Sequence, residues 1–217
     1  MKKIKISLIV LNVLSFVVTG VFLLFLGDLV PIHFGVDGTP DQFGSKYFML
    51  LFPTLSTVIS VIMLLVCKYA KVTENYAKYT LTTGVVVELL FLAISMIFCA
   101  YALSYTEEQP GFDMSKIMMY LMGSLLIFMG NYMPKVEKNR TLGLKTTWAK
   151  YNEVTWQKSQ RFMAYASVIS GVIVFISGLF FQETINMIIL SVCVFGMVFA
   201  GVIASYIYYK QEKLKEN

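Results

Sequence analysis

The side chains that could support chemistry are few, and the first group lies near the start of the chain. The only histidine, His33, stands close to Asp37 and Asp41. One imidazole and two carboxylates can bind a metal ion, but this spacing matches no established closed site. Carboxylates beside a glycine usually belong to a turn, so we expect no metal here. The chain also lacks nucleophile, phosphate-loop and dinucleotide motifs, so we expect neither an enzyme nor a bound cofactor.

A second candidate is Glu88, which stands in the middle of a long apolar run. An ionisable side chain at membrane depth costs about 2.5 kcal/mol or more, so it usually faces other helices and has a polar partner. Asn12 and Ser56 are plausible partners. Two interpretations stay open. Glu88 is either a protonated, hydrogen-bonded group that stabilises the helices, or part of a proton or peptide pathway.

Apolar residues dominate the rest of the chain, with 57% hydrophobic and 14% charged residues. A soluble domain has about a quarter charged residues, which excludes a soluble globular enzyme. Six apolar runs approach the roughly 20 residues that cross a bilayer, and each must be helical to satisfy its own backbone groups. They cover residues 6–27, 47–67, 81–105, 117–133, 163–181 and 185–209. The predicted fold is therefore an all-α integral membrane bundle of six helices.

The lysines and arginines predict the orientation, because they resist translocation across the membrane. If the amino terminus is cytoplasmic, only Lys46 and Lys116 of the 18 basic residues lie outside. Both termini are therefore predicted to be cytoplasmic. The net charge of +5 then follows from membrane topology, and we expect no direct binding of nucleic acid. The first apolar run is too long for a cleaved signal peptide, so we expect it to remain as the first helix.

The outer loop at residues 28–46 contains Asp37-Gly38, a dipeptide typical of a hairpin turn. We expect this loop to be short and folded between the first two helices. It is either a cap over the helix ends or a recognition surface. Lys46 could alternatively reach lipid phosphate with its ammonium group. The recognition candidates are His33, Phe34, Asp41 and Lys46.

The inner segment at residues 134–161 contains seven basic residues and both tryptophans. Asn152 followed by Glu153 predicts the start of a helix that runs into the fifth span. The segment is either a platform packed at the membrane interface or a docking surface for a partner. Farther along the chain, small residues four positions apart predict close packing between the fifth and sixth spans. These pairs are Ser167 and Gly171, Gly196 and Ala200, and Gly201 and Ser205.

Both loops carry motifs that resemble known families. The outer residues Pro31-x-His33-Phe34, Gly38-x-Pro40-Asp41 and Gly44-Ser45-Lys46 resemble the extracytoplasmic domain DUF1648. The inner motif resembles the SdpI family of bacterial immunity membrane proteins. Its matching residues are Asn131, Pro134, Asn139, Gly143, Thr146, Trp148, Trp156 and Arg161. The resemblance implies a DUF1648-like segment at residues 1–79 and an SdpI-like segment at residues 80–217.

The inner motif departs from the family at two places. Lys145-Thr146-Thr147-Trp148 stands where the family usually has Arg-Thr-Pro-Trp, and Ser159-Gln160-Arg161 stands where it has Thr-His-Arg. The chain therefore lacks the proline that fixes a turn and the histidine that titrates near neutral pH.

The resemblance implies an immunity protein of the bacterial cell membrane. In the family, the best-understood member protects its cell against a secreted toxic peptide and, with toxin bound, holds a small autorepressor at the membrane. The resemblance therefore implies a toxic peptide as partner of the outer loop and a DNA-binding autorepressor as partner of the inner segment. The alternative is a small membrane transporter or channel that uses Glu88. A membrane enzyme is a third and weaker alternative.

Overall fold

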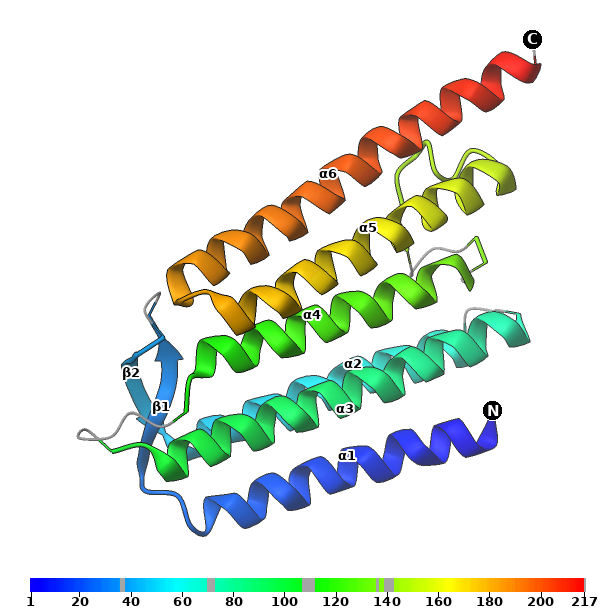
Figure 1. Ribbon diagram of the computed structural model, residues 1–217. Helices are drawn as coiled ribbons and strands as arrows, with labels where there is room; N and C mark the ends of the chain where they lie inside the picture. The colour runs from blue at the N-terminus through cyan, green and yellow to red at the C-terminus, as the bar shows by residue number, and fades with distance from the viewer. Residues whose placement is uncertain (36–37, 70–72, 107–111, 136, 139–142, 217) are drawn as a thin grey trace. The chain divides into compact units, whose positions relative to one another are not determined.

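The computed structural model describes residues 1–35, 38–69, 73–106, 112–135, 137–138 and 143–216 (Figure 1). In these ranges, six helices are long and apolar enough to cross a membrane, which confirms the predicted number of spans. A short 3-10 helix, η1 (Lys46–Leu50), leads into α2, and another, η2 (Met133–Lys135), follows α4. The six long helices are α1 (Lys2–Leu23), α2 (Leu51–Tyr69), α3 (Glu74–Ser104), α4 (Met114–Tyr132), α5 (Glu153–Phe180) and α6 (Glu183–Glu216).

Three of the helices extend well beyond the apolar runs that predicted them. Helix α3 begins at Glu74, where the Thr73 side chain accepts a hydrogen bond from the backbone N–H of Tyr76. Helix α5 begins at Glu153 after the predicted cap Asn152, and the Thr155 side chain completes a capping box. Hydropathy cannot detect these polar ends, whereas capping residues can. The helix start predicted at Asn152 is confirmed.

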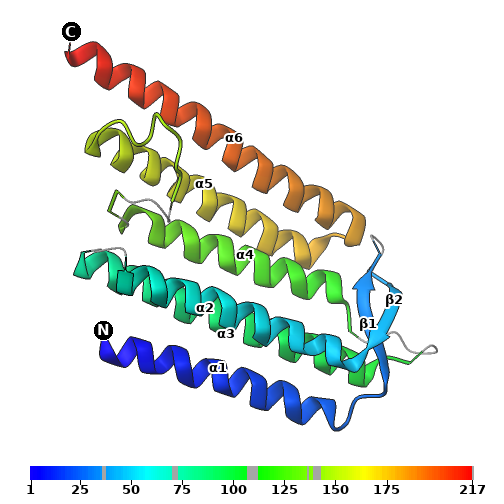
Figure 2. The ribbon, with the colours of Figure 1, turned by 180° about the vertical axis from the view of Figure 1, so that it is seen from behind.

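The chain forms two compact units, Met1–Asp113 and Met114–Asn217. The first unit contains α1, α2 and α3, which pack side by side, with α2 behind α3 in Figure 1 and in front of it in Figure 2. In the second unit, α5 lies between α4 and α6. Helix α3 therefore packs with the helices of the DUF1648-like segment. The sequence division after residue 79 concerns family resemblance and stays a prediction.

The outer loop folds as an antiparallel hairpin of strands β1 (Leu29–Phe34) and β2 (Pro40–Ser45). Gly38 adopts a φ of 74°, which glycine tolerates without steric strain. The folded loop predicted between the first two helices is confirmed, and Asp37 of the turn signal lies outside the described residues. A buried cluster of Leu26, Val30, Met49 and Cys99 joins the hairpin to the ends of α1, α2 and α3.

The small residues of α5 pack against α4, contrary to the predicted pairing with the sixth span. The Ser167 hydroxyl donates to the Leu126 carbonyl oxygen at 2.7 Å, and a Cβ on Gly171 would lie 2.7 Å from the Gly123 carbonyl oxygen. Gly201 does face α5, where an added Cβ would meet Met163. A Cβ on Gly196 would meet nothing within 4 Å. The spacing indicates close packing, but it does not name the partner helix.

Candidate functional site

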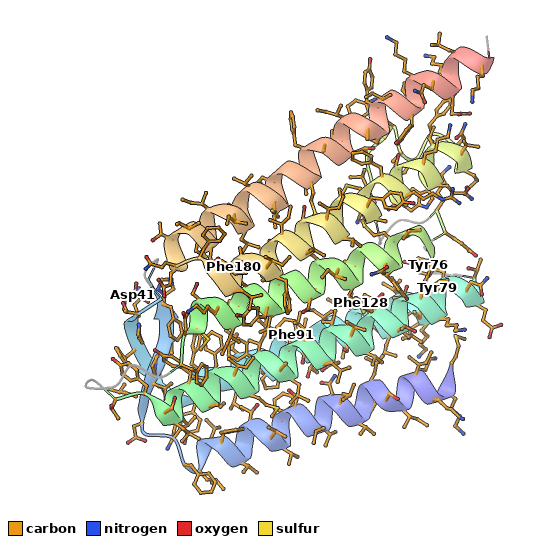
Figure 3. The ribbon with its side chains drawn as sticks, in the orientation of Figure 1. Asp41, Tyr76, Tyr79, Phe91, Phe128 and Phe180 are labelled. Carbon is orange, nitrogen blue, oxygen red and sulfur yellow. The ribbon has the colours of Figure 1, made fainter. Side chains whose placement is uncertain are left out.

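The exposed face of the hairpin carries a histidine–carboxylate pair. His33 Nδ1 lies 2.6 Å from Asp41 Oδ1, and the two side chains are 59% and 46% exposed. Strand pairing sets His33 opposite Gln42, and irregularities in the register on both sides of His33 bring Asp41 within reach. Asp41 lies at the hairpin end of the first unit, and Tyr76 and Tyr79 lie toward the other end (Figure 3). The described residues contain no group of three such side chains that could hold a metal ion.

Phe34 and Lys46 have different positions from the exposed pair. The Phe34 ring packs edge-on against Tyr101 and Phe98 of α3, with centroid distances of 4.9 and 5.7 Å. The Lys46 side chain is 21% exposed, and its ammonium group donates to the Leu26 carbonyl oxygen at 3.4 Å and lies 3.3 Å from an Asp28 carboxylate oxygen. These two side chains therefore attach the hairpin to the helices. His33 and Asp41 are the candidates that remain accessible.

An aromatic cluster that the sequence reasoning missed fixes the hairpin more firmly. Tyr101 contacts Tyr105 and Phe112, with ring centroids 5.9 and 5.4 Å apart, and Tyr105 contacts Phe43 of β2 at 5.6 Å. The four-residue spacing of Tyr101 and Tyr105 was the available signal, because such residues share one face of a helix. Because of these contacts, β1 packs on α3 and β2 packs on Tyr105, the residue that follows α3.

The Glu88 carboxyl group is fully buried in the first unit. Asn12 Nδ2 donates to Glu88 Oε1 at 2.6 Å, and the Ser60 hydroxyl donates to the same oxygen. Thr57 in turn donates its hydroxyl hydrogen to Asn12 Oδ1. The Asn12 contact therefore agrees with the expected pairing. Ser56 is a wrong partner, since its hydroxyl donates to the Pro53 carbonyl oxygen of its own helix at 3.0 Å.

The hydrogen bonds around Glu88 connect all three helices of the first unit. Asn12 belongs to α1, Thr57 and Ser60 to α2, and Glu88 to α3. A second link joins α1 and α3, with the Thr19 and Ser95 hydroxyl oxygens 2.8 Å apart. Glu88 Oε2 has no hydrogen-bond partner within the described ranges. The geometry supports the structural interpretation of Glu88, because its donors come from neighbouring helices that must stay in register to reach it.

Gln160 organises the inner segment. Its buried side-chain amide accepts from the Leu144 N–H at 3.1 Å and donates to the Leu144 carbonyl oxygen at 3.0 Å. Gly143 has a φ of 88°, and a Cβ there would lie 2.5 Å from Gln160 Oε1. Glycine is therefore required by both the backbone conformation and the space. The sequence did not predict this role of Gln160, because its partner Leu144 is 16 residues away along the chain.

The motif residues Thr146 and Trp148 contact α6. The Thr146 hydroxyl lies 2.8 Å from Ser205 Oγ and accepts from the Ala149 N–H at 2.9 Å. The half-buried Trp148 ring packs against Tyr206 with centroids 5.1 Å apart. The inner segment is thus packed onto α5 and α6, and Trp156 is almost fully buried at 1% exposure. Of the two tryptophans, only Trp148 retains partly exposed surface.

Asn131, Pro134 and Arg161 meet at the end of α4, where they line one hollow of about 360 Å³. All three side chains are exposed. Asn131 donates through Nδ2 to the Ile127 carbonyl oxygen of its own helix at 2.9 Å. The remaining candidate, Asn139, lies outside the described residues. The structure therefore packs Gly143, Thr146 and Trp148 onto α5 and α6 as one platform, and it places Asn131, Pro134 and Arg161 on an adjoining open surface. The buried Trp156 lines a hollow together with Pro134 and Arg161.

These features define a multipass membrane protein with polar groups gathered at a hairpin, in one buried network and on a platform. Residues 135–208 match the SdpI/YfhL protein family, and residues 10–57 match the domain of unknown function DUF1648. The predicted resemblance is therefore confirmed. The first match includes the platform and Arg161 beside it, and the second includes the whole hairpin.

Similarity to a characterised protein extends over nearly the whole chain. The chain is 26% identical over 211 residues to Immunity protein SdpI of Bacillus subtilis (strain 168), covering 97% of this chain and 98% of that protein. No solved structure matches the chain. Together with its six apolar helices, this similarity identifies a multipass bacterial membrane protein.

Proposed function

We propose that this chain is an immunity protein that protects its bacterium against a secreted, membrane-active peptide. The observation that carries the proposal is the similarity to an immunity protein along 97% of the chain. Because it covers nearly the whole chain, the similarity includes the residues of both the hairpin and the platform.

The proposal is tested by producing the chain in a bacterium that is sensitive to the peptide encoded by the neighbouring operon. We expect survival at peptide concentrations that kill cells with an empty vector. Membrane abundance of the chain is measured in the same cells. Equal killing of both strains at confirmed membrane abundance would contradict the proposal.

The hairpin is the surface that we assign to the peptide. It presents the polar pair His33 and Asp41 next to exposed apolar side chains, of which Leu29 is 73% and Phe43 is 47% exposed. A membrane-active peptide is itself amphipathic and lies in the interface between lipid and water. A rigid surface of mixed polarity at the end of three helices suits such a ligand, since little ordering is needed on binding.

Single substitutions separate recognition from attachment of the hairpin. His33→Ala and Asp41→Asn should lower protection while membrane abundance stays at the wild-type level, because both side chains are exposed. Gln182→Ala is the matched control, because Gln182 is exposed between α5 and α6, outside the hairpin. Phe34→Ala and Lys46→Ala should instead weaken the attachment of the hairpin to the helices. Full protection by the His33 and Asp41 variants would contradict recognition by the hairpin and would indicate that it only caps the helix ends.

The platform is the surface that we assign to a small DNA-binding autorepressor. Support comes from the family resemblance, from the partly exposed Trp148 ring and from exposed Arg161. Trp148→Ala should preserve protection and abolish induction of a reporter under the operon's promoter. Thr147→Ala, an exposed neighbour, is the control. Loss of protection together with induction in the Trp148 variant would indicate a folding defect and contradict a separate docking role.

A further inference from the structure

Two hollows of different polarity adjoin at the amino-terminal end of α5, and Pro134 and Arg161 line both. The larger, of about 360 Å³, continues along α4 and α5 between Gly130, Ala164, Tyr165 and Val168. The smaller, of about 220 Å³, is lined by charged and polar side chains, including Lys135, Glu137 and Glu153. Arg161 therefore stands where a mainly apolar groove meets a polar one.

The floor of the apolar groove is closed by direct contact between the two helices. A Cβ on Gly130 would lie 2.7 Å from the Ala164 carbonyl oxygen and 2.7 Å from Val168 Cγ2. At Gly130, the backbones of α4 and α5 therefore approach too closely for a side chain to lie between them. Tyr165, which is 72% exposed, forms one wall. The result is a shallow channel along the helix surface, with Arg161 at its polar end.

Among the described residues, no side chain pairs with either cation at this junction. Arg161 and Lys135 are exposed and make no ion pair or side-chain hydrogen bond within the part of the chain that the structure describes. Both carboxylates of the polar hollow already interact with other residues. Glu153 Oε1 lies 3.9 Å from Lys138 Nζ, and Glu137 also has a partner. The polar hollow is thus lined by both positive and negative groups.

The position of Arg161 relative to the membrane is set by the sequence. It precedes the apolar run at residues 163–181, so it lies where the hydrocarbon core meets the headgroups. A ligand that fills both hollows must therefore be amphipathic and present at this depth. A phosphodiester accepts two parallel hydrogen bonds from a guanidinium group, and an acyl chain suits the apolar groove.

We propose that this channel binds one phosphatidylethanolamine molecule. Its phosphodiester lies on Arg161 and Lys135, its ammonium group faces Glu137 and Glu153, and one acyl chain follows Gly130, Ala164 and Val168. The carboxylates favour this headgroup over an anionic one, because they attract an ammonium group and repel added negative charge. The primary ammonium also donates hydrogen bonds to carboxylates, which a quaternary amine cannot do.

Native mass spectrometry of the purified full chain in detergent tests the proposal. With phosphatidylethanolamine added, we expect a one-lipid adduct that is about tenfold or more weaker in Arg161→Gln, as a charge-assisted hydrogen bond implies. Lys210→Gln is the matched control, since it removes one exposed basic residue from α6. Lys135→Gln is a second variant and should weaken the adduct less. Equal adducts in the Arg161 and Lys210 variants would overturn the proposal.

Three further ligands test which parts of the lipid the channel recognises. Glycerophosphoethanolamine has the headgroup without acyl chains, and inorganic phosphate has neither; neither should compete with the lipid at millimolar concentration. Phosphatidylglycerol should bind more weakly than phosphatidylethanolamine. Competition by inorganic phosphate would show a simple anion site and overturn the lipid assignment. Preference for phosphatidylglycerol would overturn the assigned headgroup.

Discussion

The Glu88 network predicts how each change at this residue affects stability. Glu88→Ala removes the acceptor for Asn12 and Ser60 and leaves a cavity, so we expect a loss of about 2–4 kcal/mol in the free energy of unfolding. Glu88→Gln retains an acceptor oxygen for Asn12 and Ser60 and nearly the same volume, so it should cost less than about 1 kcal/mol. Unfolding in detergent by increasing denaturant measures both.

The control for Glu88 is Glu74→Ala, which changes an exposed carboxylate at the start of the same helix. It should change stability by less than about 1 kcal/mol. A Glu88→Gln variant as unstable as Glu88→Ala would show that an acceptor oxygen for Asn12 and Ser60 does not account for the role of Glu88. That outcome would contradict the structural role and favour a pathway through the helices.

At Gln160, the side-chain amide and the Gly143 backbone act as one unit. Gln160→Ala leaves the Leu144 N–H and carbonyl groups without their partner, at about 1–3 kcal/mol. Gly143→Ala should have a similar effect, because the φ of 88° strains alanine and its Cβ would displace the amide. We expect faster proteolysis of the inner segment in both variants, with the spans intact. Gln157→Ala, an exposed neighbour, should be cleaved at the wild-type rate.

At the scale of helices, close packing of α4 and α5 depends on Gly123 and Gly171. A Cβ on either would lie 2.7 Å from the carbonyl oxygen of the other, so Gly171→Ala must separate the helices. We expect a loss of about 1–3 kcal/mol in the free energy of unfolding, as for other overpacked contacts. Gly196→Ala should be neutral or stabilising, since nothing lies within 4 Å of its added Cβ. Equal effects of the two substitutions would contradict this packing.

The helices and the hairpin could be predicted from the sequence, whereas several contacts between them could not. The six spans follow from hydropathy, the hairpin from its turn signal and the start of α5 from Asn152, because each signal lies within a few residues of its effect. The sequence did not predict Ser60 as a partner of Glu88, nor α4 as the helix that faces Gly171. Both depend on how distant helices rotate about their axes, and an apolar helix surrounded by lipid carries little periodicity that reveals its rotation. For the same reason, Phe34 and Lys46 could not be separated from His33 and Asp41 before the contacts of Phe34 with α3 and of Lys46 with Leu26 and Asp28 were known.

At the scale of the whole molecule, the predicted orientation decides which polar surface faces which compartment. With the amino terminus in the cytoplasm, only Lys46 and Lys116 are translocated, and Lys46 lies 3.3 Å from Asp28, which reduces its exposed charge. The reverse orientation would translocate the other 16 basic residues. Such an arrangement opposes the observed bias of lysine and arginine toward the cytoplasm.

Cysteine labelling tests this orientation, and its outcome bears on both proposed surfaces. In a chain with Cys67, Cys99 and Cys193 replaced by alanine, single cysteines are placed at the exposed positions Gln42 and Thr147. We expect a membrane-impermeant maleimide to label Gln42→Cys on intact cells and Thr147→Cys only after permeabilisation. The reverse pattern would contradict the orientation. The hairpin would then face the cytoplasm, where no secreted peptide arrives, and the platform would face the exterior, where no autorepressor can bind.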